Sequence, residues 1–177
     1  MTASPDSRPL ILIVDDTPTN LGVLVELLSA HHFAVSVAED GESALEQVEY
    51  IRPDLILLDV LMPNLDGYAT CERLKALPAT RDIPVVFMTG LSDTVNKVKG
   101  FQLGAVDYIT KPFQHEEVIA RITTHLTLQQ LRQRLQESEE RLSRIIESAM
   151  DAIVTLDDAG RVKQAARATK RRSLGFP

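Results

Sequence analysis

The sequence repeats one pattern five times: a short apolar run followed by an amphipathic helical stretch. Apolar runs of four or five β-favouring residues between turn signals are typical of buried strands, and apolar residues three or four positions apart are typical of helices. Strands are expected at about 9–14, 33–38, 55–58, 84–88 and 105–109, and helices near 19–30, 42–50, 67–76, 93–103 and 114–149. This alternation predicts a doubly wound α/β fold with five parallel strands in the order 2-1-3-4-5 and an extended C-terminal helix.

Polar residues follow four of the predicted strands. The pairs and single residues at these positions are Asp15-Asp16, Asp59, Thr89-Gly90 and Lys111-Pro112. Because the carboxyl ends of parallel strands lie at one edge of a sheet, we expect these residues to meet in one pocket. Three carboxylates packed together repel one another unless a cation is present, and Mg²⁺ prefers hard oxygen ligands. The sequence therefore predicts a Mg²⁺ site formed by Asp15, Asp16 and Asp59.

The same pocket has the groups that a phosphoryl transfer needs. The Asp59 carboxylate is a candidate nucleophile, and Lys111 offers a positive charge to a phosphate oxygen. Thr89 offers a hydroxyl group to the same phosphate, and Gly90 allows the backbone to approach it. Alone, the Asp15-Asp16 pair is better explained as a cap of the following helix, for which Thr19 or Asn20 is a further candidate. The matching positions of Asp59 and Lys111 favour the metal site.

Charge and composition limit the classes of partner. The chain of 177 residues has a formal net charge of −6, but residues 159–177 contain six bases and no acid. Thirteen bases and twenty-five acids remain in residues 1–158, which therefore carry −12 and are not expected to bind nucleic acid. Cys71 is the single cysteine, and no apolar run approaches the about 20 residues that cross a bilayer. A cytoplasmic protein without a membrane partner is expected.

The last predicted helix changes character after residue 125. A seven-residue repeat places Leu128, Leu135, Leu142 and Ala149 at its first position and Leu131, Ser138 and Ile145 at its fourth, and all but Ser138 are apolar. This spacing is typical of a two-stranded coiled coil, in which Arg134 and Glu139 are placed to pair between parallel chains. A homodimer through residues 126–149 is expected; the alternative is a helix that lies along its own domain.

Residues 9–125 resemble the receiver domain of two-component response regulators. The resemblance is carried by residues 11–16 (ILIVDD), 55–67 (LILLDVLMPNLDG), 86–90 (VFMTG) and 104–113 (GAVDYITKPF). It implies a flavodoxin-like fold and phosphotransfer to Asp59, with Mg²⁺, from a histidine kinase or a phosphotransfer protein. A phosphoacceptor that switches conformation, and not a metabolic enzyme, is therefore expected. A phosphatase with an aspartyl nucleophile is a weaker alternative, because Leu61 stands where that class needs a second aspartate.

The resemblance also implies finer roles for particular residues. Mg²⁺ contacts are implied for Asp15 or Asp16, for Asp59 and for the backbone carbonyl of Leu61. Tyr108 stands at the position of a switch aromatic that moves inward when Thr89 moves to the phosphate, and the Lys111–Pro112 peptide bond is implied to be cis. Leu61 and Leu91 depart from a frequent family choice, because one of these two positions often carries a polar side chain.

A second resemblance begins beyond the receiver-like segment. Residues 138–162 resemble the linker helix and the opening strands of a PAS sensor domain, and residues 151–177 are too few to complete one. The expected organisation is a disordered terminus at 1–8, a receiver domain at 9–125, a coiled-coil linker at 126–149, and a truncated PAS-like segment with a basic tail at 150–177.

Overall fold

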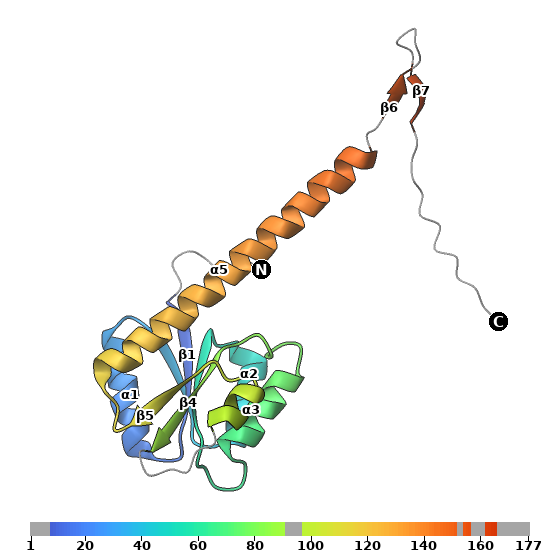
Figure 1. Ribbon diagram of the computed structural model, residues 1–177. Helices are drawn as coiled ribbons and strands as arrows, with labels where there is room; N and C mark the ends of the chain where they lie inside the picture. Colours follow the sequence, from blue (N-terminus) through green and yellow to red (C-terminus); the bar gives the residue numbers. More distant parts are fainter. Residues whose placement is uncertain (1–7, 91–96, 152–153, 157–161, 166–177) are drawn as a thin grey trace, which may run out of the picture. The chain divides into compact units, whose positions relative to one another are not determined.

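A five-stranded parallel sheet forms the centre of the N-terminal compact unit (Figure 1). The computed structural model describes residues 8–90, 97–151, 154–156 and 162–165. The strands of the sheet are β1 (Leu10–Val14), β2 (Ala34–Ala38), β3 (Leu55–Asp59), β4 (Val85–Gly90) and β5 (Asp107–Lys111). Their order is β2-β1-β3-β4-β5, which confirms the predicted α/β fold.

Helices cover both faces of this sheet. They are α1 (Pro18–Ala30), α2 (Gly41–Ile51), α3 (Gly67–Ala76), α4 (Lys97–Gln102) and α5 (His115–Asp151). Leucines of α1 and the first part of α5 share one buried cluster with one side of the sheet, whereas α2 and α3 share a second cluster with the other side. Both faces are therefore protected from water, as parallel sheets require.

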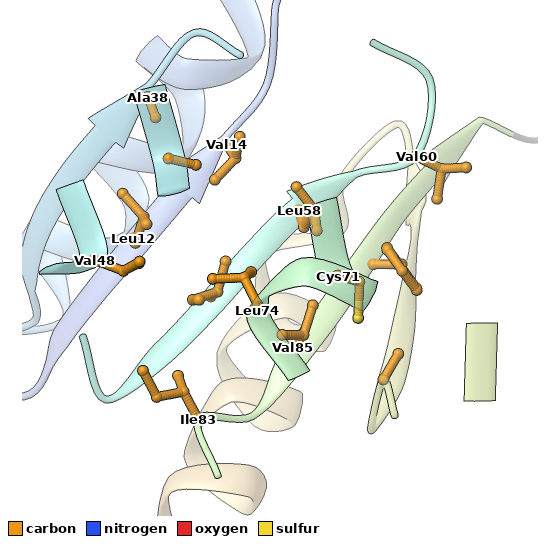
Figure 2. Close-up of a cluster of buried hydrophobic side chains, with 14 of the residues drawn as sticks. Leu12, Val14, Ala38, Val48, Leu58, Val60, Cys71, Leu74, Ile83 and Val85 are labelled. Atoms are coloured by element: carbon orange, nitrogen blue, oxygen red, sulfur yellow. The ribbon is translucent and has the colours of Figure 1, made fainter. Parts of the chain in front are cut away.

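Successive residues of each central strand enter different cores. Ile11 and Ile13 pack with α1 and α5, and Leu12 and Val14 pack with α2 and α3. Figure 2 shows the second cluster, in which Val48, Cys71 and Leu74 approach the strands. Because side chains alternate along a strand, burial of both faces explains why the strand sequences are continuously apolar.

The described chain divides into two compact units, Met1–Gln129 and Gln130–Pro177. The first contains the five-stranded sheet. The second contains the remainder of α5 and an antiparallel pair of strands, β6 (Val154–Leu156) and β7 (Val162–Ala165). Among the described residues, no helix combines the length and the hydrophobicity that crossing a bilayer requires. The predicted domain boundaries and the PAS-like segment stay predictions, and the terminus expected to be disordered lies almost wholly outside the described residues.

The predicted position of the fifth strand is wrong by two residues. Ala105 and Val106 are apolar, but they lead into the strand, which begins at Asp107. Gly104 ends the preceding turn with a φ of +93°, and the ladder with β4 starts where Val86 pairs with Asp107. Both apolar residues pack against the cores, so their hydrophobicity reports burial and not strand pairing.

Other boundaries also differ from the expectation. The β4 strand extends through Thr89 and Gly90, because these residues pair with Thr110 and Lys111 of β5. The candidate site residues of β3, β4 and β5 are thus the last residues of their strands and not the first residues of loops. The helix expected over 93–103 is described from Lys97 to Gln102, and residues 91–96 lie outside the described part.

Candidate functional site

Two buried carboxylates mark the carboxyl edge of the sheet. Asp15 directly follows β1 with none of its surface exposed, and Asp59 ends β3 with 4% exposed. Asp16 is exposed beside them. One carboxylate oxygen from each of the three residues lies within 4.8 Å of the others, so the structure brings together the acidic cluster that the sequence predicts.

Lys111 joins the two buried carboxylates. Its Nζ atom lies 2.8 Å from Oδ2 of Asp15 and 3.0 Å from Oδ2 of Asp59. Burial alone would lower the pKa of Lys111, but hydrogen bonds to Asp15 and Asp59 raise it above its usual value. The ammonium group is therefore held in its charged form. The Lys111–Pro112 peptide bond that follows is cis.

The Asp59 carboxylate remains incompletely stabilised. Loss of water around the buried group raises the pKa of Asp59, while the hydrogen bond and the charge of Lys111 lower it without cancelling the rise. The nearby charge of Asp15 raises the pKa further, and a hydrogen bond from the Leu61 backbone lowers it. An additional positive charge beside Asp59 would oppose both effects that raise the pKa.

The charges in the pocket fit a divalent cation. With three ionised carboxylates and one ammonium group, these four side chains have a net charge of −2. The donors are hard oxygen atoms, and exposed Asp16 leaves one side of the cluster open to water. Mg²⁺ binds few carboxylates and retains several waters, so this donor set suits it.

Thr89 and Gly90 reach the same edge from β4. In the sheet register, Asp59 pairs with Met88, so Thr89 lies one residue beyond it towards the carboxyl edge. Thr89 is buried, and Gly90 pairs with Lys111 of β5. The predicted phosphate-binding residues are thus at adjacent strand ends. Leu91, which follows them, lies outside the described residues, whereas the side chain of Leu61 is 58% exposed.

The sequence reasoning missed the contact of Asn20 with Asp15. The Nδ2 atom of Asn20 lies 3.0 Å from Oδ1 and 3.1 Å from Oδ2 of Asp15, and the Thr17 backbone N–H donates to Oδ1 at 2.9 Å. The prediction that Thr19 or Asn20 caps the first helix is wrong. Helix α1 begins at Pro18 after Thr17, which makes no side-chain capping hydrogen bond. The signal in the sequence was an amide side chain in the first helical turn after Asp15.

Tyr108 lies inside an aromatic cluster, three residues before Lys111 on the same strand. It extends from β5, is 6% exposed, and packs against Phe87 and Phe101 with ring centroids 5.4 Å and 5.2 Å away. Burial, followed by the influence of Tyr68, raises the pKa of Tyr108 to about 12. A Cβ atom on Gly100 of α4 would overlap the Tyr108 hydroxyl. The absence of a side chain at Gly100 therefore permits this buried ring position.

Comparison with known proteins identifies relatives of the first unit. The sequence profile of the response regulator receiver domain matches residues 11–123. Response regulator PleD of Caulobacter vibrioides is 41% identical over 128 residues, which cover 70% of this chain and 28% of PleD. The chain thus spans only about a quarter of the length of the curated relatives that it matches first.

Solved structures give the same result. A putative response regulator from Chloroflexus aurantiacus has 36% sequence identity and a TM-score of 0.66, with 68% of this chain and 99% of that chain covered. The receiver domain of a sensor histidine kinase from Pseudomonas aeruginosa has 29% identity and a TM-score of 0.64, with the same coverage. That structure was determined with a magnesium ion coordinated in its active site cleft.

Substitution of Gly100 by alanine tests the packing of Tyr108. The added methyl group would overlap the Tyr108 hydroxyl, and the ring is expected to leave its buried position because a side chain moves more easily than the sheet. The pKa of Tyr108 should then fall from about 12 towards the usual 10. At about pH 11, ultraviolet difference absorbance should show one more ionised tyrosine in Gly100→Ala than in the unsubstituted chain.

Tyr108→Phe serves as the control, because it removes the group whose ionisation is followed. The double variant Gly100→Ala with Tyr108→Phe should show no extra ionisation relative to Tyr108→Phe alone. An ionised fraction in Gly100→Ala that equals the unsubstituted value would contradict the steric role of Gly100.

Proposed function

Because the chain belongs to the response regulator receiver domain family, we propose that Asp59 accepts a phosphoryl group from a histidine kinase or a phosphotransfer protein. The observation that carries the proposal is the buried Asp59 carboxylate, which is bound by Lys111 and lies beside two further carboxylates. This carboxylate lies at a strand end and is shielded from most solvent. The neighbouring carboxylates suit a bound cation, and Lys111 suits a phosphoryl oxygen.

The proposed step is a nucleophilic displacement at phosphorus. An Asp59 oxygen forms a bond to phosphorus while the phosphorus–nitrogen bond of the donor phosphohistidine breaks, and the electron pair leaves with the imidazole nitrogen. Lys111 transfers its contact from the carboxylates to a phosphoryl oxygen, the Thr89 hydroxyl donates to a second oxygen, and the Gly90 backbone lies close to the group. These three residues form the proposed phosphate-binding set.

Mg²⁺ is the proposed cofactor of this reaction. We assign its protein ligands to Asp15, Asp16, Asp59 and the backbone carbonyl of Leu61, with either or both of the first two in direct contact. When bound, the ion neutralises charge on the carboxylates and on the phosphoryl oxygens. The two unbalanced negative charges of the pocket and its hard oxygen donors support this assignment.

The proposed output is a conformational switch. Thr89 moves towards the phosphoryl group, and the inward position of Tyr108 is stabilised by the space that this movement leaves. Tyr108 contacts Phe101, which is a residue of helix α4. This contact connects the switch with α4. We propose that this surface signals to an output domain or partner. The non-enzymatic role, the cytoplasmic location and the absence of a nucleic-acid partner stay predictions.

We further propose that residues 126–149 form a parallel homodimeric coiled coil that links the receiver domain (9–125) to a PAS-like segment (150–177). The leucines and isoleucine at the predicted contact positions are 48–62% exposed in the single chain, namely Leu128, Leu131, Leu135, Leu142 and Ile145. Exposed apolar side chains at heptad spacing lose water contact when two such helices associate. This exposed heptad pattern supports the proposed dimer.

Replacement of Asp59 by asparagine tests the phosphoacceptor. The amide retains the size of the side chain but is not a nucleophile, so acetyl phosphate with Mg²⁺ should label the unsubstituted chain and leave Asp59→Asn unlabelled. Intact-mass spectrometry measures the added phosphoryl group. Asp82→Asn, a change at a largely exposed aspartate, is the matched control and should be labelled normally. Stoichiometric labelling of Asp59→Asn would refute the assignment.

Introduction of charge along the helix tests the dimer. Leu128→Lys with Leu135→Lys places charges in the proposed seam, where unpaired burial costs several kcal/mol, and should yield a monomer by light scattering. Gln133→Lys with Gln136→Lys adds the same charge on the outer face of the helix and should leave the dimer intact. A monomeric unsubstituted chain at protein concentrations on the order of tens of micromolar would contradict the coiled coil.

A further inference from the structure

The carboxylate of Asp15 has more partners than its burial alone requires. A buried carboxylate needs hydrogen bonds to replace lost water. Asp15 already receives the Thr17 backbone N–H at Oδ1 and the Lys111 ammonium group at Oδ2. The side-chain amide of Asn20 adds contacts to both oxygens, at 3.0 Å and 3.1 Å. Each oxygen therefore accepts two hydrogen bonds.

The contact of Asn20 differs in kind from the other two. Thr17 and Lys111 each hold one oxygen, so neither alone fixes the plane of the carboxylate. Asn20 contacts both oxygens with one nitrogen, and it therefore holds the position of the carboxylate group as a whole. Asn20 lies in the first turn of α1, which packs on the sheet through Leu21 and Leu24, so its backbone is firmly placed.

We propose that Asn20 is a positioning residue that fixes the Asp15 carboxylate for Mg²⁺ binding. This inference rests on the proposed function, because it concerns the Mg²⁺ site of the same pocket. Lys111 is shared with Asp59 and is proposed to move to a phosphoryl oxygen, which would leave the contacts of Thr17 and Asn20 on the Asp15 carboxylate among those that the described residues make. Hydrogen bonds behind a metal-binding carboxylate orient it, and their removal commonly weakens metal affinity by about 10–100-fold.

The test is a double-mutant cycle on Mg²⁺ affinity, measured by calorimetric titration of the full chain. Asn20→Ala should raise the dissociation constant for Mg²⁺ by about 10-fold. Asp15→Asn should also weaken binding, but addition of Asn20→Ala to Asp15→Asn should cause little further loss, because the two residues act as one unit. Thr19→Ala, a change at an exposed position beside Asn20, is the control and should leave affinity unchanged.

A second readout separates positioning from general damage to the fold. The Mg²⁺ concentration that gives half of the maximal rate of labelling by acetyl phosphate should rise about 10-fold in Asn20→Ala. The rate at saturating Mg²⁺ and the thermal unfolding midpoint should stay close to those of Thr19→Ala. A merely structural role would instead lower both the maximal rate and the unfolding midpoint.

The outcomes distinguish this inference from the proposed function. Unchanged Mg²⁺ affinity in Asn20→Ala, or an equal loss in the presence and absence of Asp15→Asn, would overturn the role of Asn20 while the phosphoacceptor assignment stands. Failure of the unsubstituted chain to bind Mg²⁺ or to be labelled at Asp59 would overturn the proposed function and this inference with it.

Discussion

The ion pairs of Lys111 with Asp15 and Asp59 are the interaction on which the site depends. Two carboxylates with almost no exposed surface share one ammonium group across strands β1, β3 and β5. Removal of one partner from such a group leaves an uncompensated buried charge, which commonly costs about 3–5 kcal/mol. The arrangement requires all three strands to end at one edge of the sheet. The pairing of Gly90 with Lys111 places the lysine backbone at this edge, beside the end of β4.

The packing around the site is equally restrictive. A Cβ atom on Gly67, the first residue of α3, would overlap the carbonyl oxygen of Asp59, so this helix begins in direct contact with the end of β3. A Cβ atom on Gly100 would likewise overlap the hydroxyl oxygen of Tyr108, so the absence of a side chain there allows the ring to lie close to the helix. Both glycines are used for close approach within helices and not for unusual backbone angles, since their φ values are not in the left-handed region.

The fold and the acidic pocket could be predicted because their signals are local. A strand buried on both faces is continuously apolar, and the residue at its end is visible in the sequence, which identified Asp15 and Asp59. The start of β5 could not be predicted, because buried Ala105 and partly buried Val106 pack against the cores without joining the ladder. The contact of Asn20 depends on where Pro18 starts α1, and an asparagine near a helix start is otherwise read as a cap.

The main prediction is that this pocket holds Mg²⁺ and a phosphoryl group on Asp59. A crystal structure of the chain with Mg²⁺ and beryllofluoride, which mimics an acyl phosphate by bonding to a carboxylate, tests it most directly. We expect beryllium bonded to an Asp59 oxygen, fluorine atoms in contact with Lys111 and Thr89, and Mg²⁺ among the carboxylates of Asp15, Asp16 and Asp59. Beryllofluoride bound at another residue, or a pocket in which Lys111 still bridges Asp15 and Asp59 at saturating concentrations of both reagents, would contradict it.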